Sequence, residues 1–241
     1  MKILRFLAFA LTPLAVLPAF AQTIQINKDN RSIAITATAS VIAMADTATV
    51  HIGFIAYGPD KDSAYSNGSS LSNAIIKALT AAGIPADTIE SENQSVSPVQ
   101  EYQIHDLNAA DKSMRQFQVT QSWTVRTNAA DAAKVLDVAV KAGANQSGQI
   151  DWSLKDENAP QAEAAAKALQ RARTVAGEMA SGLNAKLGAL IYASNEAQAQ
   201  PPVPLIRPGA GVVMAEKVTP LAINPRRIEK SATVYAVFAI D

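Results

Sequence analysis

The sequence predicts an α+β fold: a largely antiparallel sheet with three helices packed on one face and a proline-rich arm before the last strand. Several stretches alternate apolar and polar residues with a period of two, which is typical of strands that bury one face. Three alanine-rich stretches place apolar residues at helical spacing instead. The expected order is two strands, a helix, two strands, a helix, a strand, a helix, a strand, the arm and a final strand. This order departs from the strict alternation of a doubly wound parallel sheet and favours an antiparallel one.

The composition is typical of a globular protein. The chain has 241 residues, of which 49% are hydrophobic and 17% are charged. No cysteine is present, so disulfides, thiolate nucleophiles and cysteine-ligated metal sites are excluded. Nucleic-acid binding needs a clustered basic surface, and the isolated pair Arg226-Arg227 does not supply one. We therefore expect no nucleic-acid partner.

The N-terminal residues 1–21 have the pattern of a signal peptide. Lys2 and Arg5 precede an apolar stretch, and Ala19-Phe20-Ala21 ends it with a small-residue cleavage pattern. We expect cleavage after Ala21, export of the chain, and a single mature domain over residues 22–241. A retained membrane anchor is the alternative, but the apolar stretch is short of the roughly 20 residues that a span needs. No later stretch predicts a transmembrane segment.

The mature chain is expected to open with two strands. The first places four apolar residues on one face: Ile33, Ile35, Ala37 and Ala39. The second runs from Thr47 to Tyr57 with the same alternation. We interpret the break between them, Ala43–Asp46, as a hairpin turn, although it lacks the Asn-Gly pair that two-residue hairpins favour.

The first helix is expected to begin near Asp60 or Asp62, either of which can cap it, and to end at Gly83. Gly68 weakens its first half, because glycine inside a helix costs about 1 kcal/mol relative to alanine.

The polar stretch Ile89–Tyr102 favours a strand, and Pro98 within it indicates an edge or a bulge. The next stretch, His105–Arg115, is expected to be a hairpin loop. Four apolar residues mark the strand that follows: Phe117, Val119, Trp123 and Val125.

Asn128 is expected to cap the second helix, which Gly143 ends. A short strand follows at Ile150–Leu154. The third helix opens at Asn158, and seven residues are expected to line its inner face: Ala162, Ala165, Leu169, Ala172, Ala176, Met179 and Leu183. Another strand follows at Leu187–Ala193. The final strand has five apolar residues on one face: Ala232, Val234, Ala236, Phe238 and Ile240.

Residues 194–227 form the proline-rich arm or loop, which holds six of the twelve prolines. A stretch of this length without a regular pattern is unusual inside a compact domain. It also contains apolar residues, which either pack on their own domain or dock on a neighbouring subunit. The candidate subunit contacts are Leu205, Ile206, Val212, Val213 and Met214.

The sequence contains no recognisable catalytic constellation. Of the two histidines, His51 is expected to be a solvent-facing strand residue, and His105 lies beside Asp106 in a polar stretch. A metal site needs three or four convergent ligands, and a nucleophile elbow needs Gly-x-Ser-x-Gly. Gly209-Ala210-Gly211 lies in the arm, where it cannot act as a phosphate-binding loop between a strand and a helix. We expect no catalytic residue, no metal site and no cofactor.

Paired carboxylates leave a hydrolase as a further alternative. Glu90 and Glu92 are expected on one strand face, and Asp156-Glu157 precedes the third helix. A glycosidase needs two such groups in a cleft. However, acidic residues at a helix start are expected from the helix dipole alone.

Four stretches, in order along the chain, carry a resemblance to a known family: residues 81–98, residues 123–126 with 135–145, residues 150–154 leading into the helix that ends at 183–188, and residues 231–234. The chain resembles the SIMPL-domain family of bacterial envelope proteins. It departs from the family in the first turn, where Thr38-Ala39-Ser40 and Ala45-Asp46 replace a glycine-rich segment and a Pro-Asp pair.

The resemblance implies an α+β domain that assembles into large ring-like or channel-like homo-oligomers in the periplasm. It implies no catalytic residues, and it suggests a link with stress defence. That link cannot rest on thiols, because the chain has none. The resemblance and the arm together favour a non-catalytic envelope protein that acts through self-assembly, with other protein partners unknown. The alternatives are a small-ligand or peptide-binding module and, with less support, a carboxylate-dependent hydrolase.

Overall fold

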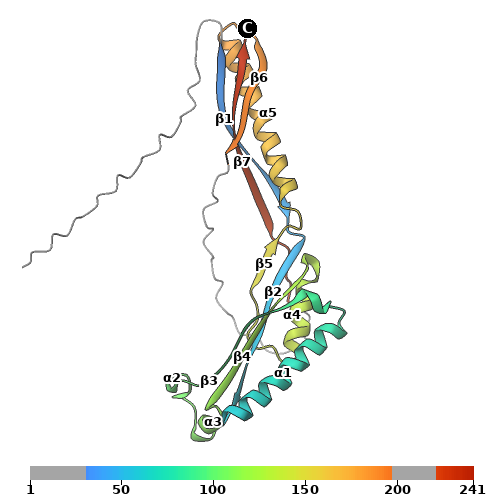
Figure 1. Ribbon diagram of the computed structural model, residues 1–241, viewed down its shortest axis with the longest axis vertical. Coiled ribbons are helices and arrows are strands. Elements are labelled where there is room, and N and C mark those ends of the chain that lie inside the picture. The colour runs from blue at the N-terminus through green and yellow to red at the C-terminus, as the bar shows by residue number, and fades with distance from the viewer. Residues whose placement is uncertain (1–30, 197–220) are drawn as a thin grey trace, which may run out of the picture.

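The computed structural model describes residues 31–196 and 221–241, and its strands form two antiparallel sheets arranged end to end along the long axis (Figure 1). The three-stranded sheet has the order β1-β7-β6 and is built from Ser32–Met44, Arg227–Ile240 and Leu187–Glu196. The four-stranded sheet has the order β3-β4-β2-β5 and is built from Ile89–Pro98, Phe117–Asn128, Thr47–Gly58 and Ile150–Ser153. The α+β class and the antiparallel pairing are confirmed, and the strands divide between two sheets.

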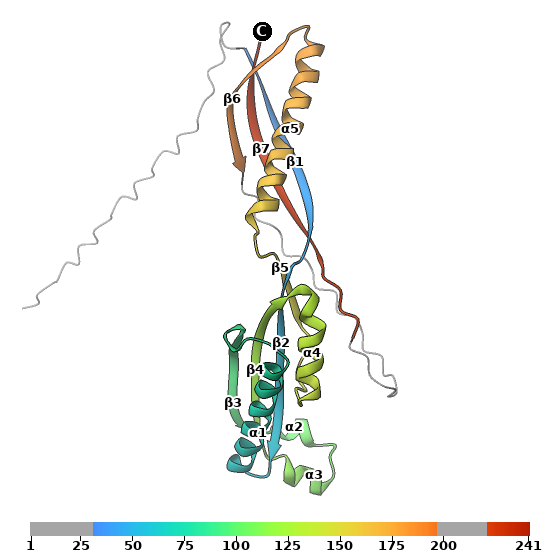
Figure 2. The same cartoon turned by 90° about the vertical axis from the view of Figure 1, so that its right-hand side faces the viewer.

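Long helices cover one face of each sheet (Figure 2). Helix α5 (Asn158–Gly182) packs on β1 and β7 of the three-stranded sheet. Helices α1 (Lys61–Ala81) and α4 (Ala132–Lys141) pack on the four-stranded sheet, and α1 contacts mainly β2 and β4. These three helices correspond to the three that the sequence predicts.

The hairpin expected at Ala43–Asp46 is wrong. Strand β1 pairs with β7, whereas β2 pairs with β4 and β5, so the chain passes from one sheet to the other at Ala45-Asp46. Neither residue adopts the positive φ that a tight hairpin turn requires. Other segments hold the passage instead: Ala45 N–H donates to the Arg226 carbonyl at 2.9 Å. The Lys155 N–H donates to the Asp46 side chain at 2.7 Å.

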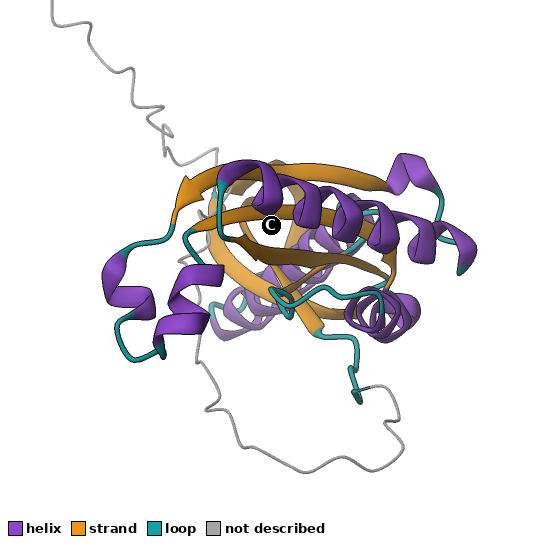
Figure 3. Ribbon diagram, turned by 90° about the horizontal axis from the view of Figure 1, so that it is seen from below, coloured by secondary structure: helices purple, strands orange, loops and turns teal. Residues whose placement is uncertain are grey.

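The segment expected as a hairpin loop, His105–Arg115, does lie between two antiparallel neighbours, β3 and β4. The connection is not a plain loop, because it contains two short helices, α2 (Glu101–Ile104) just before this segment and α3 (Ala109–Met114) within it. They lie as a pair at one side of the molecule (Figure 3). Side-chain caps explain them. Gln100 and Gln103 form a reciprocal capping box at the start of α2, and Asn108 accepts a hydrogen bond from Asp111 N–H at 2.9 Å. Such short polar helices show no apolar period in the sequence.

The cap expected for α1 is confirmed. Asp60 accepts hydrogen bonds from the backbone N–H of Ser63 at 2.7 Å and from its hydroxyl at 2.9 Å. Gly83, with φ +87°, ends this helix. Asn128 differs from the expectation, because a 3₁₀ turn at Ala129–Asp131 precedes α4 and the Asn128 side chain caps no backbone N–H.

The inner face of α5 is rotated from the expected one. Its buried residues recur every four positions and are all alanine: Ala164, Ala168, Ala172, Ala176 and Ala180. Met179 and Leu183, which were expected to be buried, are exposed. A ridge of methyl groups lets the helix axis approach the sheet closely, and larger side chains on that ridge would overpack the interface.

Each sheet has its own hydrophobic core. In the four-stranded sheet, the rings of Phe54 and Trp123 pack with their centroids 5.8 Å apart beneath α1 and α4. In the three-stranded sheet, Phe238 and the apolar side chains of β1 pack against the alanine ridge.

Candidate functional site

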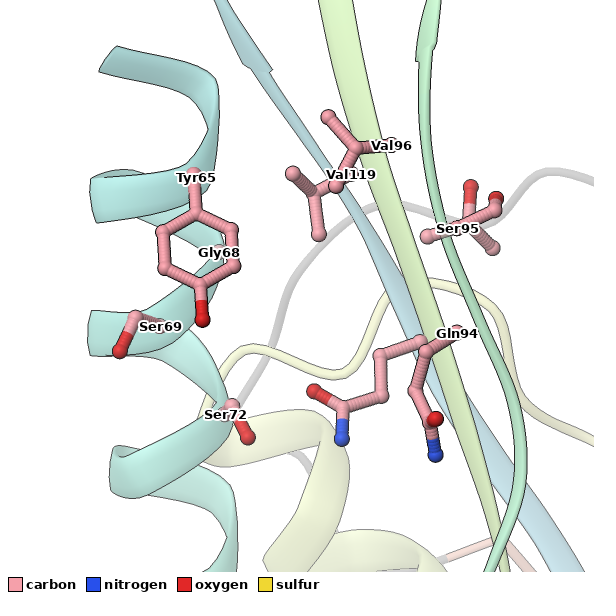
Figure 4. Close-up of a pocket in the computed structure, with 10 residues that line it drawn as sticks. Tyr65, Gly68, Ser69, Ser72, Gln94, Ser95, Val96 and Val119 are labelled. Carbon is pink, nitrogen blue, oxygen red and sulfur yellow. The ribbon is translucent and has the colours of Figure 1, made fainter. Parts of the chain in front are cut away.

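A groove between α1, β3 and β4 is the first candidate for a binding site (Figure 4). Its volume is about 460 Å³, within the range of small-molecule sites. Ten residues line it: Tyr65, Gly68, Ser69, Ser72, Gln94, Ser95, Val96, Val119, Thr120 and Gln121. None of them is Asp, Glu, Lys, Arg or His, so the lining offers hydroxyls, carboxamides, an aromatic ring and two valines.

Gly68 determines how closely the helix approaches the floor of this groove. A Cβ atom at this position would lie 2.8 Å from Cγ1 of Val119, which is shorter than side chains tolerate. The missing side chain therefore allows α1 to pack directly on β4. The sequence showed Gly68 only as a weak point in the helix, and the structure gives the packing reason for it.

The groove is open on one side because α1 lies over β2 and β4 and leaves β3 largely uncovered. Strand β3 is an edge strand, and its residues from Glu90 to Val96 are all exposed. Gln94 of β3 lies directly opposite Gln121 of β4. The two carboxamides therefore stand beside each other on the face that α1 borders.

His51 is the centre of a second group of side chains, on β2. Its Nε2 lies 2.8 Å from Oδ2 of Asp151, and its Nδ1 lies 3.3 Å from Oε1 of Glu92. The sequence predicts a solvent-facing histidine, but the side chain is only 24% exposed. Partial burial alone would lower the pKa of His51. The hydrogen bonds to Asp151 and Glu92 outweigh this effect, and the net result is a raised pKa.

Two local features bring the carboxylates to His51. Asp151 lies on β5, which pairs with the first half of β2. The loop before β5 extends this pairing, because Gln149 accepts a hydrogen bond from His51 N–H at 2.9 Å. Glu92 lies at an irregularity in β3, where the register with β4 shifts between Ser91 and Asn93.

The other sequence-predicted polar residues do not converge on either site. His105 pairs with Asp106 at 2.9 Å on an exposed surface. Asp156 accepts a hydrogen bond from Asn158 N–H at the start of α5, and Glu157 pairs with Lys230 at 3.1 Å. Neither expected carboxylate pair lines the groove. Within residues 31–196 and 221–241, no group of three or more His, Asp or Glu side chains is arranged to hold a metal ion.

A third candidate surface is the three-stranded sheet, whose two edge strands carry exposed apolar side chains. On β6 these are Leu190, Ile191 and Tyr192, and on β1 they are Ile42 and Met44. The sequence predicts subunit contacts in the arm instead. Those residues, Leu205, Ile206, Val212, Val213 and Met214, lie outside the described part of the chain, as do residues 1–21 and Gly209-Ala210-Gly211.

Comparison with known proteins decides the family. The model of the family described as "SIMPL: Protein of unknown function (DUF541)" matches residues 33–238, which takes in both sheets. The chain belongs to the SIMPL family. The resemblance seen in the sequence is therefore confirmed. That residues 22–241 form a single domain stays a prediction.

Two relatives of this SIMPL protein carry the name "26 kDa periplasmic immunogenic protein". One is from Brucella melitensis biotype 1 and the other from Brucella abortus strain S19. Each is 25% identical over 192 residues, which cover 79% of this chain and 77% of the relative. In the portion of the chain that the structure describes, no helix is both long and apolar enough to cross a bilayer.

Proposed function

We propose that this SIMPL protein is a non-catalytic periplasmic protein that acts through homo-oligomeric assembly. The names of the two Brucella relatives support the compartment, and the predicted signal peptide agrees with it. The main support for assembly is that both edge strands of the three-stranded sheet expose apolar side chains. A role in stress defence stays a prediction.

Both edges of this sheet are suited to contacts with another copy of the chain. Strands β1 and β6 each pair only with β7, so within residues 31–196 and 221–241 each has one side without a backbone partner. A free edge that also exposes large apolar side chains is a ready site for association. Ile191 illustrates this, with 55% of its surface exposed on β6.

The two edges differ, which favours a particular type of assembly. The apolar residues of β6 lie where this strand pairs with the C-terminal half of β7. The apolar residues of β1, Ile42 and Met44, lie opposite Glu229 and Arg227, beyond the reach of β6. Contact between unlike edges is heterologous. Repeated heterologous contacts generate a closed ring when the rotation from one subunit to the next leads back to the first subunit.

The test is the oligomeric mass of an edge variant and a matched control. Ile191→Lys places a charge on the β6 edge, where it should oppose association. Met114→Lys makes the same type of change at a residue that is 59% exposed on α3, in the connection between two strands of the four-stranded sheet. We expect light scattering to give a smaller particle for Ile191→Lys and the wild-type mass for Met114→Lys. Equal masses for all three proteins would contradict an assembly through β6.

A further inference from the structure

We propose that the groove between α1 and β3 binds an uncharged oligosaccharide. This inference goes beyond the proposed assembly, since the groove belongs to the four-stranded sheet and the proposed contacts belong to the other one. It rests on the shape of the groove, on the chemistry of its lining and on the absence of formal charge among its ten lining residues.

The helix supplies one wall of the site. Tyr65, Ser69 and Ser72 are spaced four and three residues apart, so they share one face of α1. Figure 4 shows these three side chains along the helix, opposite β3. Tyr65 is 63% exposed, which leaves its ring free to pack against the C–H face of a sugar.

The strands supply the floor and the other wall. Gln94 and Gln121 are cross-strand neighbours on the side that faces α1. Each carboxamide carries two N–H donors and an oxygen acceptor, and each serine hydroxyl both donates and accepts. A sugar hydroxyl also donates and accepts, so this set matches a ligand with several hydroxyl groups. Val96 and Val119 add a small apolar surface to the lining.

Charge decides which ligands this lining can hold. A carboxylate, a phosphate or an ammonium group would lose hydration on entering the groove and would find no opposite charge among the lining residues. A neutral oligosaccharide avoids this cost. The volume of about 460 Å³ accommodates only part of a longer chain, and the open side along β3 leaves room for the remainder.

The experiment is NMR titration of the purified protein with three neutral probes: chitotriose, maltotriose and cellotriose. We expect at least one to shift the side-chain amide resonances of Gln94 and Gln121 with millimolar affinity. Tyr65→Ala and Gln94→Leu should each weaken this binding several-fold, and up to about tenfold for the lost hydrogen bonds. Tyr102→Ala on α2 and Gln170→Leu on α5 are the matched controls, because both residues are exposed and lie outside the groove.

Each result has a definite meaning. Shifts confined to the groove and lost in the two groove variants support the proposal. No localised shift with any of the three sugars at 10 mM, a concentration about tenfold above a millimolar Kd, overturns it. Shifts that survive both groove variants also overturn it, as do equal shifts with a charged sugar such as galacturonic acid. Circular dichroism of each variant verifies that a loss of binding does not come from unfolding.

Discussion

At the scale of single residues, His51 links three strands of the four-stranded sheet. Its imidazole lies between Glu92 of β3 and Asp151 of β5, while His51 itself belongs to β2. Because both ring nitrogens face a carboxylate, the doubly protonated imidazolium satisfies both contacts and the neutral ring satisfies only one as a donor. The arrangement therefore couples the packing of the two outer strands to the charge of one side chain.

This coupling predicts a pH dependence of stability. The pKa of His51 in the folded protein is raised above its ordinary value of 6.5. The stabilisation of the folded protein by the His51 imidazolium should be fully present below pH 6.5 and should be lost as the pH rises through the pKa of His51 in the folded state. We expect His51→Gln to destabilise the protein by about 1 kcal/mol or less in mildly acidic solution, and by a smaller amount at pH 8.5. Urea unfolding at pH 5.5, 7 and 8.5 measures the difference.

The control for this prediction is His105→Gln. His105 is 64% exposed and pairs with its neighbour Asp106, so its replacement should change stability little at any of these pH values. A destabilisation by His51→Gln that grows as the pH rises would contradict the proposed role of the imidazolium.

The sequence could not predict the surroundings of His51. Alternation correctly placed it on a strand, on the side opposite the buried residues. Its partner Asp151 is 100 residues away along the chain, and Glu92 reaches it only because β3 changes register nearby. No local pattern reports contacts of this type. Pro98 correctly indicated that β3 is an edge strand or carries a bulge, and the structure has both. The groove also requires that α1 leaves this edge largely uncovered, which no sequence pattern indicates.

At the scale of elements, close helix–sheet contacts in this molecule depend on missing side chains. Helix α5 approaches its sheet along a ridge of alanines, and α1 approaches β4 at Gly68. In both cases a small residue brings the helix backbone close to the side chains of the strands. The positions of these residues determine where each helix lies over its strands.

Alanine substitution of two helical glycines tests this reading. Gly68→Ala should destabilise the protein by roughly 1–3 kcal/mol, because the new Cβ would lie 2.8 Å from Val119. Gly177→Ala in α5 is the matched control, since the nearest atom would be 3.9 Å away. It should stabilise the protein by roughly 0.5–1 kcal/mol through helix propensity. Thermal and urea unfolding measure both, and a stabilising Gly68→Ala would show that α1 is not limited by this contact.

Sequence patterns predicted whether a segment is a helix or a strand more reliably than they predicted which strands pair with each other. The caps at Asp60 and Gly83 and the alternation in β2 and β4 were sufficient to place helices and strands. The expected hairpin failed because two consecutive strands can pair or can continue into different sheets, and only the turn residues distinguish these cases. The absence of Asn-Gly at Ala43–Asp46 was the available signal. The helices α2 and α3 were missed because their order comes from side-chain caps rather than from an apolar face.

At the scale of the whole molecule, the two sheets have different surfaces. The four-stranded sheet presents a neutral groove beside α1 and a histidine–carboxylate cluster on β2. The three-stranded sheet presents exposed apolar residues on two unlike edges. This division favours a molecule whose three-stranded end makes the subunit contacts while the groove remains accessible.

Assembly is tested most directly by the mass of the purified mature protein, measured by light scattering from about 1 to 100 µM, a range that spans micromolar dissociation constants. Assembly through the apolar edges predicts a particle of several chains whose mass does not fall to that of one chain as the solution is diluted within this range. A strict monomer of at most 25.3 kDa at every concentration would contradict it.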